Sequence, residues 1–455
     1  MLVTIWRQGV ILLLSVLCAA GMVDYHLGLF VPRAMAVRAA QGFGDGYSFG
    51  ADFYPIWLTS REGLLHHRDP YSPEMTRQIQ TGLFGRALDA PNPAAPQDYR
   101  AFAYPAFVDV LFWPLALLPF SVVRIGLAVI LAAATALSVV LWLRASRLRT
   151  SPIVLVSLTL LTLSSYVVLE GLFAEQVGLI VGFLLAAVFV ALVDGRLVLS
   201  GSLLALTLIK PQMTALIVAY LFLWSFRQWR VRWRFVGSFL IVSVLLGVAS
   251  LLVWPHWISE WVGVVFGYRQ YSTPPLVSYL LGNPIGSRLG PFLIAALLAT
   301  AIALAWRMRH ASPTSTEFAL TIGFLLAVTA ITLLPGHAVY DHVVLLPGVI
   351  WIAFSWRGFA ASSHVFRVVL GMTALALFWQ WILAPAVIAI RPILPPQLFD
   401  SAVLTLPIRT AGSIPFGVFT LLWLMLRQVQ QKQLPSVENH RLPAAENRLT
   451  FKNLF

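Results

Sequence analysis

The chain is poor in the residues that build soluble catalytic domains. Only 11% of its 455 residues are charged, and it has one cysteine, Cys18, which excludes an intrachain disulfide and a cysteine metal cluster. Acidic residues are scarce as well, at 18 Asp and Glu against 31 Lys and Arg. The basic residues are dispersed between apolar runs, so we interpret them as signals of membrane orientation and expect no nucleic-acid partner.

Apolar sequence is what the chain has in excess. Hydrophobic residues make up 59% of it and its mean hydropathy is +0.82, values beyond those of soluble domains. The composition predicts an all-α polytopic membrane protein in contact with membrane lipids. The first apolar run follows Arg7 as in a signal sequence, but Leu17 is not the small residue that a lipoprotein site needs before its cysteine. We therefore expect an uncleaved first span.

Twelve apolar runs approach the length of about 20 residues that crosses a bilayer. They lie near 9–30, 121–143, 152–169, 177–194, 198–209, 213–226, 235–254, 291–306, 317–334, 342–356, 366–385 and 410–427. On this count Lys and Arg concentrate in the segments of one side, as cytoplasmic loops require. We expect both termini in the cytoplasm, one membrane domain over 1–430, and a disordered basic tail over 431–455.

The segment 31–103 is the long polar loop, and the topology places it outside. Two interfacial helices are expected in it. In the first, Trp57, Leu58, Leu64 and Leu65 repeat at heptad spacing, and in the second Ser72 caps, Pro73 fits the first turn, and Met75, Ile79 and Leu83 form one apolar stripe.

The stretch 104–120 is apolar enough to be a short span. Counting it as one would reverse the side of every later loop and contradict the distribution of basic residues. We therefore predict a re-entrant or interfacial helix, interrupted by Pro105, Pro114 and Pro119.

Polar residues that end or interrupt the apolar runs gather on the outer face in this topology. They include Asp52, Tyr104, Glu175, Gln176, Lys210, Arg269, Arg288, His337, Asp341 and His342. The predicted active surface thus faces away from the cytoplasm, where nucleotide-activated substrates are found.

A set of ordered landmarks resembles glycosyltransferase family 87. They are Asp52-Phe53-Tyr54, Asp69-Pro70-Tyr71, Tyr104-Pro105, the run Pro114 to Pro119, Glu175-Gln176-Val177, Lys210-Pro211 and Tyr340-Asp341-His342. Two positions depart from the family pattern, Ala106 for a second proline and Glu175 for a glycine. The resemblance implies a GT-C-type fold and an inverting transfer of sugar, commonly mannose, from a polyprenyl phosphate to a glycolipid or glycan.

Asp52 is the candidate catalytic base. An inverting transfer needs one group to take the proton of the acceptor hydroxyl, and an aspartate, with an ordinary pKa of about 3.9, is ionised at neutral pH. The alternative is a loop aspartate or a helix cap.

Lys210 is the main candidate for binding the donor phosphate. A cation in an apolar run costs on the order of 3 kcal/mol at mid-bilayer and requires a partner, which a lipid phosphate would provide; snorkelling to the interface is the alternative. Arg269 and His337 are further phosphate candidates.

Substrate contacts are expected from Tyr54, Tyr104, Glu175, Gln176, Asp341 and His342. Glu175 and Gln176 could contact sugar hydroxyls or cap a helix. The spacing of His337, Asp341 and His342 matches no strong zinc pattern, so no metal or other cofactor is predicted.

Two other functions stay open on the sequence. A polytopic transporter or flippase would also carry intramembrane charge, although no internal repeat is evident and the long outer loop is poorly explained by transport. A ligase that joins whole glycans would work on the same face.

Overall fold

The computed structural model describes residues 2–44, 46–88, 99–268, 271–360 and 363–433, and every element within them is a helix. The elements in order are α1 (Leu2–Asp24), η1 (Tyr25–Phe30), α2 (Val31–Ala40), α3 (Tyr54–His66), α4 (Pro73–Phe84), α5 (Phe107–Ala116), α6 (Phe120–Ala145), α7 (Pro152–Leu163), α8 (Tyr166–Ala174), α9 (Gly178–Val193), α10 (Leu197–Leu206), η2 (Thr207–Ile209), α11 (Pro211–Arg227), α12 (Trp229–Val253), α13 (Trp257–Tyr268), α14 (Leu276–Leu281), α15 (Ile285–Met308), α16 (Thr316–Thr332), η3 (Val339–Leu345), α17 (Leu346–Ala360), α18 (His364–Ile390) and α19 (Pro396–Gln433).

The all-α polytopic membrane fold is confirmed. Within the described ranges seven helices are long and apolar enough to cross a membrane, and the pair α7 and α8, bent by 58°, makes an eighth if it counts as one span. Each of the twelve predicted runs overlaps a helix, but several helices are short, as α9 and α16 are. The number twelve therefore stays a prediction.

The first helix is longer than expected. The helix does not end near residue 30. It continues through a π-helical turn, η1, into α2 and ends at Ala40. Pro32 lies in the first turn of α2, directly after the π-helical turn, and contributes no amide proton to the hydrogen bonds of the helix. The tail predicted over 431–455 lies outside the described residues beyond Gln433.

Both helices expected in the outer loop are present. In α4, Ser72 accepts the amide proton of Met75, and Met75, Ile79 and Leu83 are buried as the stripe predicted. In α3, Trp57, Leu58 and Leu64 are half-buried and Leu65 is exposed, so the interfacial placement of this helix stays a prediction.

The buried face of α3 is instead partly polar. Thr59 and Ser60 are fully buried, and their hydroxyls donate to the Asp109 carboxyl of α5 at 2.8 and 3.2 Å. Hydrogen bonds to a neighbouring helix thus determine which face of α3 is buried. The pattern of apolar residues in the sequence does not predict such a face.

Both ends of α5 are bonded to residues of the segment 31–103. The Tyr71 hydroxyl donates to the Tyr104 carbonyl before the helix, and Arg61 and Trp57 of α3 donate to the carbonyls of Ala116 and Leu118 after it. Both ends of α5 thus contact one segment of the chain, and its re-entrant or interfacial placement stays a prediction.

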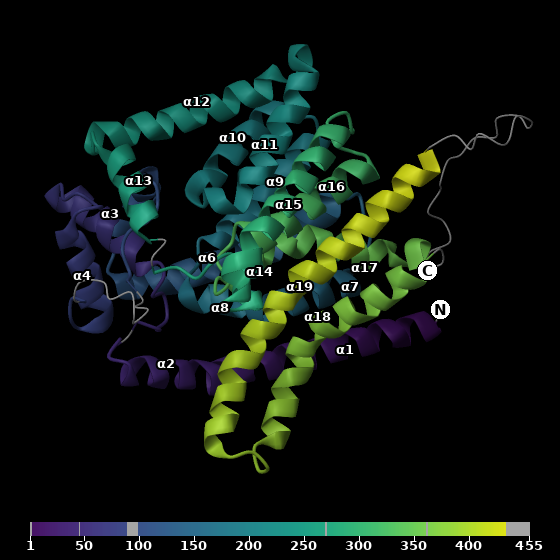
Figure 1. Ribbon diagram of the computed structural model, residues 1–455, viewed down its shortest axis with the longest axis horizontal. Helices are drawn as coiled ribbons and strands as arrows, with labels where there is room; N and C mark the ends of the chain where they lie inside the picture. Colours follow the sequence, from purple (N-terminus) through teal and green to yellow (C-terminus); the bar gives the residue numbers. More distant parts are fainter. Residues whose placement is uncertain (1, 45, 89–98, 269–270, 361–362, 434–455) are drawn as a thin grey trace, which may run out of the picture.

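The helices α3 and α4 of the segment 31–103 lie at one end of the molecule, and the first and last described residues lie at the other (Figure 1). α3, α4 and α13 lie at one end, at the left of the view, whereas α1 begins and α19 finishes at the other. Among the basic residues at helix ends, Arg144 in the last turn of α6 binds Asp194 at 2.7 Å and Arg227 of α11 contacts His310.

Candidate functional site

The segment that carries Asp52 is bonded to the end of α8. The last carbonyls of a helix have no partners within it, and here the amides of Gly50 and Asp52 donate to the carbonyls of Phe173 and Ala174 at 2.9 and 3.1 Å. Gly50 has φ +81°, a conformation that glycine adopts at little steric cost. These bonds bring Asp52 next to the residues that follow α8.

The Asp52 carboxylate has a cation on one oxygen and an amide on the other. Arg100 forms an ion pair with Oδ1, and the side-chain amide of Gln176 donates to Oδ2. Arg100 also donates to the carbonyl of Gly46 at 3.2 Å, so it closes the segment 46–52 on itself. Because a carboxylate offers about four lone-pair positions, Asp52 can still accept a bond from a substrate hydroxyl.

Lys210 continues the same line of contacts. It is 5% exposed, and its Nζ donates to Oε1 of Gln176 at 2.8 Å and to both carboxylate oxygens of Asp341 at 2.7 and 2.9 Å. The ring centroid of Tyr340 lies 5.2 Å from the ammonium. Pro211 begins α11 and cannot extend the preceding helix, so the chain breaks at Lys210.

We call Arg100, Asp52, Gln176, Lys210 and Asp341 the charged chain. Arg100 lies in the loop before α5 and Asp52 in the loop before α3. Gln176 lies at the α8–α9 junction, Lys210 at the η2–α11 junction and Asp341 in η3. Two formal cations face two formal anions, so the charged chain has no net formal charge.

Asp52 stays ionised at neutral pH. Burial alone would raise its pKa, but the charge and hydrogen bond of Arg100, the hydrogen bond of Gln176 and the charge of Lys210 together hold the pKa of Asp52 below its ordinary value. The group can therefore accept a proton at once, although its low pKa makes it a weak base.

Glu175 lies beside the charged chain in an unusual state. It caps α8 with φ +57°, a conformation that costs a non-glycine residue roughly 1 kcal/mol, and its side chain is fully buried. Neither carboxyl oxygen has a hydrogen-bond partner among the described residues. Burial raises the pKa of Glu175 to about 8, against the opposing charge of Arg124.

The other predicted residues lie at different distances from the charged chain. Tyr54 packs against Phe120 at 5.1 Å and turns its hydroxyl towards Gly82 of α4. The exposed His337 is near Asp341 and bonds Thr273 at 2.7 Å through Nδ1.

Tyr104 lies near Tyr340, and His342 is buried in η3 close to the backbone of Ala411. Arg269 lies outside the described residues. In the part of the chain that the structure describes, no three His, Cys, Asp or Glu side chains are grouped as a metal site needs.

Comparison with known families decides the class of protein. The model of glycosyltransferase family 87 matches residues 102–335, which is more than half of the chain. The chain belongs to glycosyltransferase family 87. No curated protein matches the sequence.

This family 87 protein is thus a membrane glycosyltransferase, and the prediction from the ordered landmarks is confirmed. The matched region contains Glu175, Gln176 and Lys210. Asp52 and Asp341 lie outside the matched region, but each contacts a residue inside it. Gln176 donates a hydrogen bond to Asp52, and Lys210 donates one to Asp341.

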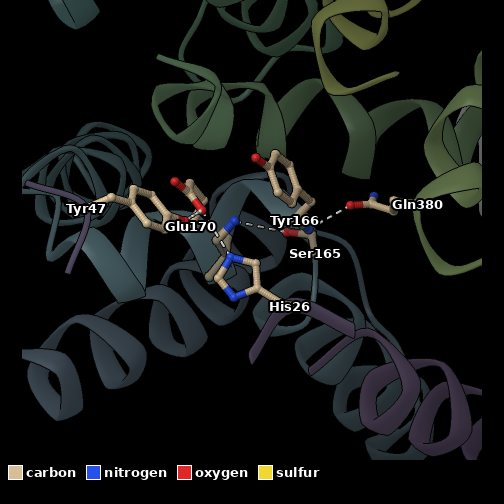
Figure 2. A network of polar contacts seen from close by, with 7 residues as sticks. His26, Tyr47, Ser165, Tyr166, Glu170 and Gln380 are labelled. Atoms are coloured by element: carbon tan, nitrogen blue, oxygen red, sulfur yellow. Dashed lines mark hydrogen bonds and ion pairs between the residues drawn. The ribbon is translucent and has the colours of Figure 1, made fainter. Parts of the chain in front are cut away.

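Sequence reasoning about this glycosyltransferase missed a second polar group, which we call the Tyr47 cluster: His26, Tyr47 and Glu170. Figure 2 shows His26 and Tyr47 pointing at the same Glu170 carboxylate, at 3.0 and 2.8 Å from Oε2. His26 lies inside an apolar run and Glu170 directly follows one, and their position was a usable signal because ionisable residues within membrane segments are rare and mark functional sites.

Proposed function

We propose that this protein transfers a sugar, mannose first among the candidates, from a polyprenyl-phosphate donor to a glycolipid or glycan acceptor, with inversion. One observation carries the proposal. Gln176 bridges the carboxylate of Asp52 and the ammonium of Lys210, so a base and a cation stand two hydrogen bonds apart. Group transfer to a hydroxyl needs both charges close to the reacting carbon.

The base in this proposal is Asp52. The acceptor oxygen attacks the anomeric carbon, the bond from that carbon to the phosphate oxygen breaks, and the polyprenyl phosphate leaves with the electron pair. Asp52 takes the hydroxyl proton. Arg100 holds the carboxylate in place and keeps it ionised.

The cation for the departing phosphate is Lys210, with Arg269 and His337 as further contributors. All three protons of the Lys210 ammonium are directed at Asp341 and Gln176, so phosphate binding requires that it exchange one of these bonds. The developing dianion of the leaving group competes better for that proton than the singly charged donor does, which favours the transition state.

Glu175 suits the hydroxyls of the substrate. Its oxygens have no partner among the described side chains, and Arg124, whose buried Nε also lacks a bond there, opposes its pKa shift by charge. A hydroxyl both donates and accepts, so a neutral sugar fits between a carboxyl and a guanidinium better than an amine or a phosphate does. Tyr54, Tyr104, Asp341 and His342 complete the proposed substrate contacts.

The membrane orientation is part of the proposal. We infer that the protein lies in the cell membrane with both termini in the cytoplasm and the charged chain on the outer face. In a Cys18→Ala background, Glu74→Cys, at an exposed position of α4, should react with an impermeant thiol reagent in intact cells, and Ser312→Cys at the opposite end only after lysis. The reverse pattern would contradict the orientation.

Transfer by purified protein tests the reaction. Labelled polyprenyl-phosphate mannose and a lipid-extract acceptor in detergent should give a labelled product, and Asp52→Asn should not. Asp69→Asn, in the same outer loop, is the matched control, since its side chain can still accept the amide proton of Tyr71. Formation of product from nucleotide sugars alone would refute the proposal that the donor is a polyprenyl-phosphate sugar. Absence of product with any acceptor would favour a transporter or flippase, and transfer of a whole glycan would favour a ligase.

A further inference from the structure

The Tyr47 cluster lies where the outer loop meets two membrane helices. Glu170 is in the middle of α8, His26 is in the π-helical turn η1, and Tyr47 is five residues before Asp52. The Tyr47 hydroxyl donates to Oε2 of Glu170 at 2.8 Å, and Nε2 of His26 is 3.0 Å from the same oxygen. One carboxylate oxygen thus ties three separate segments together.

The cluster is fixed by packing as well as by hydrogen bonds. The His26 side chain has no exposed surface and stacks on Phe30 at 5.5 Å. The Tyr47 ring lies 5.2 Å from Phe173 and 6.2 Å from Phe30. A π-helical turn holds one more residue than an α-helical one and is frequent at functional sites, and here it contains both His26 and Phe30.

The attachment of Tyr47 is the first of three from one segment to one helix. Tyr47 bonds Glu170, Gly50 bonds the Phe173 carbonyl, and Asp52 bonds the Ala174 carbonyl. The two backbone bonds are 2.9 and 3.1 Å long and lie at the Asp52 end, so Tyr47 fixes the opposite end of the segment. Arg100 bonds both Gly46, next to Tyr47, and Asp52, and so links the two ends of the segment, which allows a shift at Tyr47 to reach the carboxylate.

We propose that Tyr47 and Glu170, supported by His26, are positioning residues for the carboxylate of Asp52. The inference rests on the proposed role of Asp52 as the base. Tyr47 and Glu170 touch no reacting atom. They hold the segment 46–52 against α8, so that Asp52 meets the acceptor hydroxyl at the distance that proton transfer needs, where a misplacement of about 1 Å can cost up to a hundredfold in rate.

The test removes one hydroxyl. Tyr47→Phe keeps the ring contacts and should lower kcat by about tenfold with little change in the donor KM, as expected for misplaced catalytic geometry. Glu170→Ala should act in the same direction, and Glu170→Gln should recover most of the loss because its amide oxygen can accept from Tyr47. The control is Tyr220→Phe, which removes a buried hydroxyl bond of 3.1 Å to Met308 and should leave kcat unchanged.

A double variant separates positioning from general stability. If Tyr47 acts through Asp52, then adding Tyr47→Phe to Asp52→Asn should not lower the residual rate further. Equal and additive losses in both backgrounds would overturn the inference, and so would a normal kcat in Tyr47→Phe. Wild-type protein that transfers no sugar refutes the proposed function instead.

A second readout needs no activity. In a Cys18→Ala background, Ser48→Cys lies within the held segment and should react several times faster with a thiol reagent when Tyr47→Phe is added. Tyr220→Phe should not change that rate. Unchanged reactivity would show that Tyr47 does not hold the segment and would overturn the inference.

Discussion

Two polar groups flank the end of α8, and they are built differently. The charged chain joins five side chains from five parts of the fold, with each formal charge balanced by an opposite one. The Tyr47 cluster has a single carboxylate that accepts bonds from an aromatic hydroxyl and faces an imidazole. The first can donate protons to a substrate or accept them, whereas the second is closed by aromatic rings. In the proposed mechanism, chemistry and positioning are thus divided between neighbouring groups at the end of one helix.

The sharpest test of this division compares the two carboxylates. Asp52→Asn removes the base and should lower transfer by at least the roughly hundredfold that general-base catalysis contributes, whereas Glu170→Gln should lower it far less. The measurement is kcat in detergent, with donor affinity as the second readout. Because Arg100 loses its ion pair, Asp52→Asn should also lower the Tm modestly. Equal losses of kcat in the two variants would contradict the division into a catalytic and a positioning carboxylate.

Within the charged chain, the Lys210–Asp341 pair should matter for folding and for donor binding together. Lys210→Met leaves Asp341, 1% exposed, without its cation, which costs on the order of 3–5 kcal/mol for a buried pair. Adding Asp341→Leu should restore most of the Tm because the buried charge is gone, but it should not restore donor affinity. Recovery of affinity in the double variant would show that Lys210 does not bind the phosphate.

The pH dependence tests the pairing of Asp52 with Arg100. This pairing holds the pKa of Asp52 down, so its stabilising effect is present above the unfolded pKa, about 3.9, and is lost as the pH falls through the lower folded pKa. Arg100→Gln leaves only Gln176 and Lys210 to oppose the effect of burial, so the pKa of Asp52 should rise and the acid limb of the kcat/KM profile should move to higher pH. Arg77→Gln, which removes a surface arginine paired with Glu74, should leave the limb in place.

The sequence predicted one half of this comparison well. Ordered landmarks selected Asp52, Gln176, Lys210 and Asp341, which are far apart in sequence and adjacent in the fold. Arg100 was missed because a loop arginine has no periodicity and no motif around it. The direction of Tyr54 was not predictable either, since it depends on how α3 packs against α4.

The Tyr47 cluster was missed for a different reason. His26 and Glu170 each look like a single polar interruption near the end of an apolar run, and the π-helical turn that contains His26 leaves no pattern in the sequence. The same limit applies to α3, whose buried face is set by the bonds of Thr59 and Ser60 to Asp109. Contacts between helices decide these features, and periodicity describes one helix at a time.

The smallest expected effect concerns Glu175, which belongs to neither group and has no partner in the described structure. Its folded pKa, about 8, exceeds the ordinary value of 4.5, so folding favours its protonated form. The resulting stability is present below the ordinary pKa and is lost as the pH rises towards 8. Glu175→Gln cannot ionise, so its Tm should exceed that of the wild type by a margin that grows from pH 5 to pH 9.

Glu62→Gln is the control for this measurement, because Glu62 pairs with Arg68 at the surface at 3.1 Å and its replacement should bring no such gain. If the Glu175 carboxyl also binds a sugar hydroxyl, Glu175→Gln should raise the acceptor KM while it stabilises the fold. A residue that costs stability and improves substrate binding is retained for function. A Tm margin that does not change with pH would mean that Glu175 is solvated or paired in the working protein, and the proposed sugar contact would lose its support.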